Sequence, residues 1–381
     1  MVLEFGKPLD PKYILIDGGP DGVFVEILDK FLKEKELTDS NSFEVMVLTH
    51  VDEDHVLGLM DYLKDYESNI QSFRPPRIKE VWHNYLEYEV NSTGTIDYSA
   101  DSTRTRGLDD NNLQNSFVDF WNDFNEFNNS KYNSSEIRFP SNFTSKSIQQ
   151  GDDFRRRIEE LKIPINTSFH PENEIIVENH PTVDIEDIKI EIIGPSKKIL
   201  DLLIKKWKKW VKKRVADRII TRGRDARIPN RSSIMFLVSS GSGDDEKRIL
   251  FTGDGRGDYI ISGLKERGLL SENEYFFVDI LKLPHHGSEY NVTPEFFDVV
   301  RATHYVASGN GGQHANPNSK TLKMIADAAK AQERNVTIWV TYDDTDQINI
   351  FRDICPEEDY TYKIKTVDSG KTFFTLELLG N

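Results

Sequence analysis

The stretch 50-HVDEDH-55 constrains this chain more than any other part of its sequence. It places two histidines and three acidic residues within six positions, after the apolar run 43-FEVMVLT-49 and before the helical pattern 56-VLGLMDYLKDY-66. Imidazole and carboxylate groups crowded this closely repel or compete unless a cation lies among them. The stretch therefore predicts a metal-binding loop between a buried strand and a helix.

The surrounding pattern indicates an α/β fold. The strand 13-YILIDGG-19 carries Asp17 at its end, and residues 23–36 have helical spacing. Further strands are expected at 174–178, 187–195, 232–240, 248–255, 276–284, 304–310 and 336–342, with helices at 197–221 and 319–333 and a terminal hairpin made of 348–351 and 372–379.

Composition changes between residues 84 and 150, where Asn, Ser, Asp and aromatic residues dominate. We interpret 78–180 as an inserted helical and loop-rich subdomain that forms a lid or substrate rim. Its aromatic residues recur at roughly helical spacing, either as a packing face or as a platform for stacking bases. They are Phe117, Phe120, Trp121, Phe124 and Phe127.

Overall composition narrows the class of protein. No run of about 18 apolar residues occurs, so no transmembrane helix is expected. Residues 1–19 lack the basic and apolar regions of a secretory signal, and the single cysteine, Cys355, cannot form an internal disulfide. Both features predict a cytoplasmic protein. A net charge of −16 argues against a nucleic-acid coat protein, although a local basic patch could still bind phosphate.

One basic run stands out from this acidic background. From Lys197 to Arg227 there are thirteen Lys or Arg residues against three Asp, on an amphipathic helical pattern that includes Ile204 and Trp207. The run is either a solvated helix face or a patch that faces phosphate groups. In the second case the contacts would come from Lys208, Lys209, Lys212 and Lys213.

Several strands end in loops that carry metal-ligand side chains. Besides Asp17 and the 50–55 loop, these side chains are Asp254, His285, His286 and His314. Five of the nine histidines fall in such loops, a concentration that predicts one shared metal site. Four donors in six residues are too many for one ion but can be divided between two. Two metals about 3.5–4 Å apart generate a hydroxide and stabilise both the attacking and the leaving oxygen of a displacement.

The motifs together resemble the metallo-β-lactamase fold superfamily of metallohydrolases. They are 16-IDGG-19, 50-HVDEDH-55 with 58-GL-59, 252-TGD-254, 285-HHGS-288 and His314. Asp52 stands where a second histidine is common, and this form resembles the hydrolase domain of the DNA-uptake competence protein ComEC and its soluble relatives. Phosphorylcholine esterases of the same superfamily are similar at these motifs. The resemblance implies an αββα sandwich, divided here into halves at 1–77 and 181–381.

The resemblance also implies roles for individual residues. His50, Asp52 and His286 would hold one metal, Asp54, His55 and His314 the other, and Asp254 would bridge the two ions. Asp54 would also orient the attacking hydroxide, and His285 would contact the phosphate or protonate the leaving group, although which of His285 and His286 is the ligand stays open. The ions would be zinc or manganese, since the carboxylate at position 52 makes its site harder. Supporting or substrate-contacting roles fall to Asp17, Asn230, Ser233 and Ser288.

Three functions remain in competition. The first is a dinuclear phosphodiesterase, with nuclease activity as its leading form and a nucleic acid or nucleotide as substrate. The second is a hydrolase of a small nucleotide, phosphate ester or amide, which the acidic net charge favours. The third is a metal-bound interaction module without turnover, which the complete ligand set disfavours. No membrane partner is expected, and the sequence identifies no protein partner.

Overall fold

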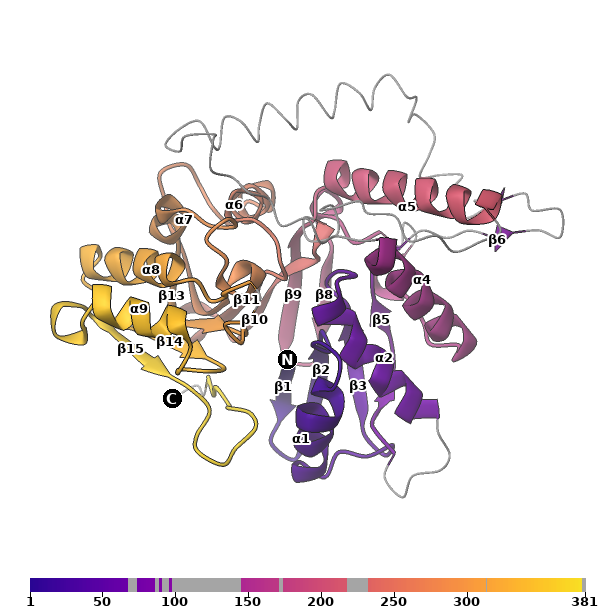
Figure 1. Ribbon diagram of the computed structural model, residues 1–381, viewed down its shortest axis with the longest axis horizontal. Coiled ribbons are helices and arrows are strands. Elements are labelled where there is room, and N and C mark those ends of the chain that lie inside the picture. Colours follow the sequence, from indigo (N-terminus) through magenta and orange to yellow (C-terminus); the bar gives the residue numbers. More distant parts are fainter. Residues whose placement is uncertain are drawn as a thin grey trace.

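The computed structural model describes residues 1–67, 74–85, 89–90, 96–97, 145–170, 174–217, 232–312 and 314–378. These residues form a mixed α/β structure with two main sheets and several helices (Figure 1). The predicted α/β class is therefore confirmed. None of the helices in this part of the chain is both long enough and apolar enough to span a membrane.

The first sheet has five strands in the order β1-β2-β3-β4, with β5 also paired to β3. β1 pairs with β2 in the antiparallel direction, whereas β2, β4 and β5 join their neighbours in parallel. The strands are β1 (Val2–Lys7), β2 (Asp10–Ile16), β3 (Ser42–Val47), β4 (Arg77–Ile78) and β5 (Val81–Trp82).

The second sheet has eight strands in consecutive order from β15 to β8. β8 to β11 are antiparallel, and β11 to β15 are parallel. The strands are β8 (Thr182–Ile185), β9 (Ile188–Gly194), β10 (Met235–Ser240), β11 (Lys247–Phe251), β12 (Phe276–Lys282), β13 (Val300–Ala307), β14 (Val336–Val340) and β15 (Tyr362–Lys365). A separate short pair consists of β6 (Glu89–Val90) and β7 (Ile96–Asp97).

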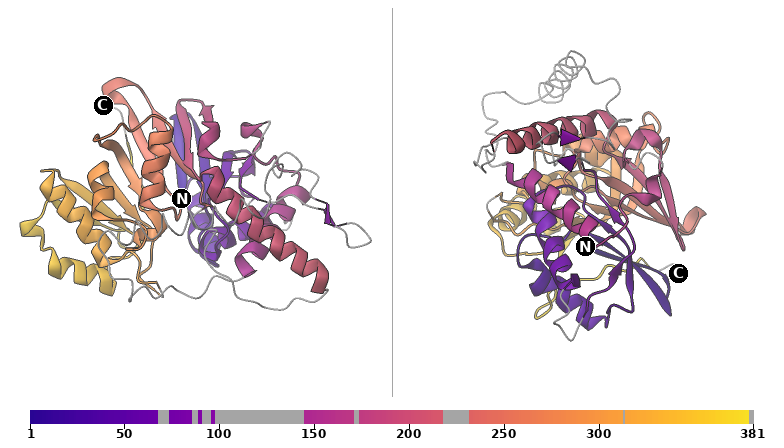
Figure 2. Two further views of the ribbon diagram at one scale, coloured as in Figure 1. Left: turned by 90° about the horizontal axis from the view of Figure 1, so that it is seen from above. Right: turned by 90° about the vertical axis from the view of Figure 1, so that its right-hand side faces the viewer.

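Helices accompany both sheets. The left view of Figure 2 shows the N-terminal elements beside the orange and yellow C-terminal elements. The α-helices are α1 (Asp29–Glu34), α2 (Glu53–Glu67), α4 (Ser145–Glu160), α5 (Lys197–Asp217), α6 (Gly257–Glu266), α7 (Pro294–Val299), α8 (Ser319–Ala331) and α9 (Asp346–Ile354). A π-helical turn, Phe24–Leu28, runs into α1, and together they account for the helix expected at 23–36.

Alternating side chains along the strands divide the core into separate clusters, because neighbouring strand residues point to opposite faces. Ile14 and Val45 of the first sheet share one cluster with Ile190 and Phe236 of the second. Side chains of both sheets therefore meet in a common core. The intervening residues face helices instead: Leu15 joins a cluster with residues of α2, α4 and α5.

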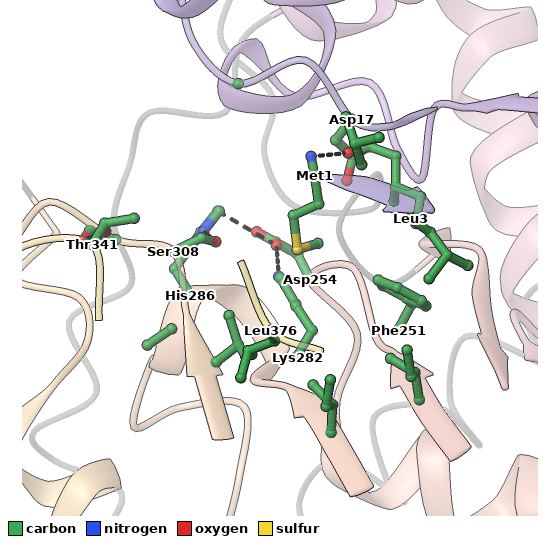
Figure 3. A pocket seen from close by; sticks show the side chains of 18 of the residues that line it. Met1, Leu3, Asp17, Phe251, Asp254, Lys282, His286, Ser308, Thr341 and Leu376 are labelled. Atoms are coloured by element: carbon green, nitrogen blue, oxygen red, sulfur yellow. Dashed lines mark hydrogen bonds and ion pairs between the residues drawn. The ribbon is translucent and has the colours of Figure 1, made fainter. Parts of the chain in front are cut away.

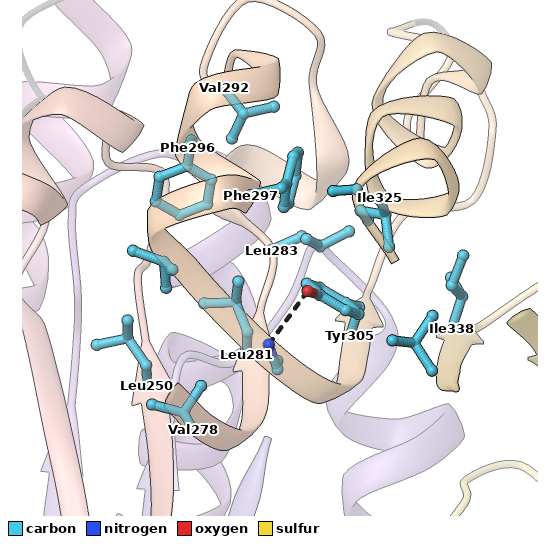
Figure 4. Packing of buried hydrophobic residues seen from close by; sticks show 14 of the residues in the cluster. Leu250, Val278, Leu281, Leu283, Val292, Phe296, Phe297, Tyr305, Ile325 and Ile338 are labelled. Atoms are coloured by element: carbon cyan, nitrogen blue, oxygen red, sulfur yellow. Dashed lines mark hydrogen bonds between the residues drawn. The ribbon is translucent and has the colours of Figure 1, made fainter. Parts of the chain in front are cut away.

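On the other face of the eight-stranded sheet, α6 to α9 supply the packing partners. Figure 4 shows Leu281, Phe296, Phe297 and Tyr305 in this cluster. Tyr305 is buried, and its hydroxyl accepts a hydrogen bond of 3.1 Å from the backbone N–H of Ala302, so its polar atom is satisfied inside the apolar core. These contacts fix the parallel strands whose ends carry the candidate site.

Three predicted strands are wrong. The segment 174–178 is not a strand: Ile175 is buried, but its N–H donates to the Asn84 side chain, so the apolar run reflects core packing. The segment 348–351 belongs to α9, where Ile348 and Phe351 are buried at helical spacing. Residues 372–378, the other half of the expected terminal hairpin, contain no strand. The strand that completes the sheet is β15.

The predicted insertion, 78–180, is joined to the core at both ends. β5 pairs with β3, and α4 packs on α2, with Phe154 fully buried. The aromatic residues at 117–127 lie outside the described residues. The described ends of this segment therefore contribute to the five-stranded sheet and to the core.

Candidate metal centre

The candidate site lies where five strands end. β2, β3, β11, β12 and β13 are followed by Asp17, the 50–55 loop, Asp254, the His285–His286 pair and Ser308 respectively. Within each sheet the strands that lead to these side chains run parallel, so their carboxyl ends meet at one edge. The predicted convergence of Asp17, the 50–55 loop, Asp254 and the histidine pair is what the structure shows.

Two glycines allow the 50–55 loop to approach the end of β2. A Cβ atom on Gly58 would lie 2.0 Å from the carbonyl oxygen of Gly18, and one on Gly18 would lie 2.1 Å from the backbone nitrogen of Leu59. The contact is closed by hydrogen bonds from the Gly18 N–H to the His55 carbonyl (2.8 Å) and from the Gly58 N–H to the Gly19 carbonyl (3.0 Å). The first turn of α2 is thereby fixed against the strand end.

Asp17 fixes the position of the 50–55 loop by hydrogen bonding. Its carboxylate accepts hydrogen bonds from the backbone N–H and the hydroxyl of Thr49, both at 2.8 Å. It also lies 2.8 Å from Nδ1 of His55. Because a carboxylate accepts, Nδ1 of His55 carries a proton, and Nε2 is the nitrogen that faces the site. The supporting role expected for Asp17 agrees with these contacts.

The donor atoms form two groups that could hold metal ions. One consists of His50, His55 and Asp254, and the other of Asp54, His55 and His286. In the second group, Nε2 of His286 is 3.1 Å from Oδ2 of Asp54 and 3.2 Å from Nε2 of His55. The resemblance implied that His286 would group with His50 and Asp52, whereas in the structure it groups with Asp54 and His55.

Asp254 belongs to the first group and also lies close to His286 of the second. Its Oδ1 atom is 3.3 Å from Nε2 of His55 and 3.6 Å from Nε2 of His286, while Oδ2 is 3.7 Å from Nε2 of His50. Nζ of the buried Lys282 is 3.6 Å from Oδ1 and donates a 2.7 Å hydrogen bond to the Gly253 carbonyl (Figure 3). A carboxylate close to donors of both groups is placed where a bridging ligand would be needed.

Unsatisfied polar atoms test whether these residues fit a cation. Nε2 of His50, Oδ1 of Asp52 and Oδ1 of Asp254 are buried without a hydrogen-bond partner in the described structure. Leaving buried polar atoms unpaired costs about 1–3 kcal/mol each. All three belong to predicted ligands, and imidazole nitrogen and carboxylate oxygen suit divalent ions such as zinc and manganese. The donor set therefore fits a metal.

The pKa shifts of the donor residues also favour a bound cation. Burial, reinforced by the neighbouring carboxylates of Asp54 and Asp254, raises the pKa of Asp52 well above its usual value. Burial also lowers the pKa of His50 to about 3, with a further contribution from His55. For Asp254, burial alone would raise the pKa, but His285 and His286 outweigh it and hold the pKa well below its usual range. The site thus concentrates buried ionisable groups whose electrostatic cost a divalent cation would reduce.

The positions of His285 and His286 bear on which of the two is a metal ligand. His286 belongs to a donor group, whereas Nε2 of His285 is 3.6 Å from Oδ2 of Asp254 and belongs to neither group. Both residues have positive φ, 48° and 56°, which is costly for non-glycine residues and is concentrated at functional sites. Nδ1 of His286 is 3.0 Å from the Ser308 hydroxyl, which orients the ring.

Helix α4 contributes contacts that sequence reasoning missed. The buried hydroxyl of Ser147 donates a hydrogen bond to the Asp52 carboxylate, and Gln150 donates to Glu53 at 3.1 Å. A Cβ atom on Gly151 would lie 2.5 Å from the Val51 side chain. No local motif marks these residues, since about 95 positions separate Ser147 from its partner.

Lys282 did carry a signal, as a lone cation in an apolar strand.

The remaining predicted site residues have different outcomes. Ser233 accepts a 3.1 Å hydrogen bond from the Asp254 N–H, as expected for a supporting residue, and Asn230 lies outside the described residues. His314 is exposed, lines the same cleft, and belongs to neither donor group.

The residues predicted to contact phosphate differ in whether they line the cleft. Ser288 is buried and lines the cleft. Lys208, on α5, is half-buried and does not line the cleft. The side chains of Lys209, Lys212 and Lys213 lie outside the described part of the chain, although their backbone belongs to α5.

The donor groups open into a cleft of about 2740 Å³. Its lining combines the metal-ligand side chains with apolar residues, among them Leu3, Phe251 and Leu376 (Figure 3). The cleft is larger than the roughly 300–1,000 Å³ of ordinary small-molecule pockets. It can therefore admit an extended substrate to the donor groups.

Comparison with family models finds no match for this sequence, and no curated protein matches it.

Proposed function

We propose that this protein is a dinuclear metal-dependent hydrolase that cleaves phosphodiesters, with nucleic acid as the leading substrate. The observation that carries the proposal is the convergence of buried, unsatisfied donors from His50, Asp52 and Asp254 beside the Asp54–His55–His286 group. We further propose that the two sheets and their helices form the αββα sandwich of the metallo-β-lactamase type, which is supported by the shared core between the sheets.

The protein's own residues would divide the work. His50, Asp52, Asp54, His55, His286 and Asp254 would hold two divalent ions, zinc or manganese. When bound, these ions would supply Lewis acidity that lowers the pKa of water and neutralises charge on the phosphate. Asp54, the most exposed donor, would orient the attacking water. His285, beside Asp254 but outside both donor groups, would contact the phosphate or the leaving oxygen.

The volume of the cleft favours an extended substrate over a small one. The proposal is tested by incubating the protein with labelled single- and double-stranded DNA and RNA in manganese, zinc or EDTA. We expect cleavage that requires metal, is lost in Asp54→Ala, and persists in Asp61→Ala on the same helix. Absence of cleavage by protein that carries its metals would overturn the nuclease assignment.

A further inference from the structure

Two exposed tyrosines stand at the cleft. Tyr290 is 65% exposed and Tyr342 is 50% exposed, and both line the cleft that contains the donor groups. Neither ring has an aromatic or cationic partner in the part of the chain that the structure describes. Tyr275 differs, because it is 56% exposed but the Arg301 guanidinium lies 3.9 Å from its ring centre.

Tyr290 is held beside the metal ligands by a compact turn. The Ser288 N–H donates to the His285 carbonyl at 3.0 Å, and the Asn291 N–H donates to the Ser288 carbonyl at 3.2 Å. The Asn291 side chain also donates to the backbone carbonyl of Asp254 at 3.1 Å. The turn is therefore bonded at both ends to residues of the candidate centre, which fixes its backbone there.

Tyr342 is connected to the site through its neighbour, Thr341. The Thr341 hydroxyl donates a 2.6 Å hydrogen bond to the Gly309 carbonyl, and Gly309 follows Ser308, which contacts His286. Figure 3 shows Thr341, Ser308 and His286 along one side of the pocket. Each exposed ring is thus one residue away from a backbone anchor of the site.

We infer that Tyr290 and Tyr342 stack on the planar rings of the substrate, which makes it a phosphodiester that carries nucleobases. Water-exposed aromatic rings without intramolecular partners beside a phosphate-cleaving centre provide the surface that bases use for stacking. Stacking tolerates any base, so the tyrosines would select for nucleotides without selecting a sequence. This inference rests on the proposed function, since it identifies the residues that would hold the bases of a substrate at the same site.

The test measures binding separately from catalysis. The zinc-loaded full chain is titrated into a 2-aminopurine dinucleotide whose phosphonate linkage cannot be hydrolysed, and fluorescence quenching reports stacking. We expect the dissociation constant to rise about tenfold in Tyr290→Ala and in Tyr342→Ala. Tyr290→Phe and Tyr342→Phe should stay within about twofold, because a phenyl ring also stacks. Tyr275→Ala is the matched control and should not change binding.

Other outcomes overturn the inference in distinguishable ways. Binding and quenching that survive both alanine substitutions would place the bases elsewhere and leave the proposed hydrolase untouched. If the wild-type chain hydrolyses bis(p-nitrophenyl) phosphate but binds no dinucleotide, the substrate class is wrong and the phosphodiesterase stands. If no phosphodiester is hydrolysed by the metal-loaded chain, the proposed function fails, whereas tyrosine-dependent quenching would still support the base-binding surface. A dinucleotide and a longer oligonucleotide, compared in the same titration, separate nucleotide from polymer recognition.

Discussion

Oδ2 of Asp17 lies 2.8 Å from Nδ1 of His55, although 38 positions separate the two residues. The contact sets which nitrogen of His55 faces the candidate metals, and His55 belongs to both donor groups. Burial alone would lower the pKa of His55, but the carboxylates of Asp17, Asp254 and Asp54 outweigh burial and raise the pKa well above its usual value. Asp17 therefore orients the ring of a histidine that both donor groups share.

Asp17→Asn should weaken metal binding without unfolding the chain. An amide can present its N–H to Nδ1 and so favour the wrong tautomer of His55, and loss of such an outer contact typically costs about 10–100-fold in metal affinity. Zinc affinity is measured by competition with a chromophoric chelator. Asp10→Asn, an exposed carboxylate on the same strand, is the control. Equal affinity in Asp17→Asn and the wild-type chain would contradict the role assigned to this contact.

Ser147→Ala should weaken binding at the Asp52 side of the centre. The substitution removes the hydroxyl that holds the Asp52 carboxylate, so one of two metal equivalents should bind about tenfold more weakly. Titration with Co²⁺ monitors the two equivalents through their visible absorbance. Ser147→Thr should restore the affinity, and Ser271→Ala, at an exposed position, should have no effect. A uniform change in both equivalents would argue against a specific contact to Asp52.

Gly58→Ala should destabilise the fold. The added methyl group would lie 2.0 Å from the Gly18 carbonyl oxygen, and this neighbour is backbone that cannot move without displacing the end of β2. Overpacking of this kind costs about 1–3 kcal/mol of unfolding free energy. Urea denaturation measures the change, with Lys64→Ala on the exposed face of the same helix as the control. An unchanged midpoint would show that the two glycines are not in such close contact.

His83 should make the fold sensitive to acid. Burial, with a contribution from Arg155, lowers the pKa of His83 to about 3, below its unfolded value of about 6.5. As pH falls, His83 is therefore protonated in the unfolded chain before it is protonated in the folded chain. The contribution of neutral His83 to the free energy of unfolding is present in full above about pH 6.5 and is lost progressively as pH falls toward 3. At pH 5 the loss amounts to about 2 kcal/mol.

The His83 prediction is checked by urea denaturation in EDTA at pH 7.5 and pH 5. In His83→Phe the difference in unfolding free energy between the two pH values should shrink by about 2 kcal/mol. His180→Phe, at an exposed histidine, is the matched control. An undiminished pH dependence in His83→Phe would mean that other groups cause the acid sensitivity.

Local sequence patterns predicted most of the elements that carry the site. The strands that precede Asp17 and Asp254 were predicted because a buried strand leaves a recognisable pattern of apolar residues in the sequence. The terminal hairpin failed because Ile348 and Phe351 fit either a strand or one face of a short helix, and a Thr345 cap decides for the helix. The grouping of His286 with Asp54 and His55 was not predicted, and His286 lies in a turn of positive φ that no periodicity encodes.

Contacts made across long stretches of chain were beyond sequence reasoning. Ser147 reaches Asp52 only because α4 packs on α2, and that packing follows from buried side chains such as Phe154 rather than from any motif. Ser308 reaches His286 because β12 and β13 are parallel neighbours. Such partners could be found only after the topology was known.

The most direct test of the account is the number of divalent ions that the purified chain retains. Inductively coupled plasma mass spectrometry after dialysis against zinc should give two ions per wild-type chain and no more than one in Asp254→Ala, because this carboxylate lies close to donors of both groups. Lys330→Ala, at an exposed position on α8 that does not line the cleft, should still retain two. A wild-type chain that retains no stoichiometric metal would contradict the dinuclear centre, and with it the proposed hydrolase.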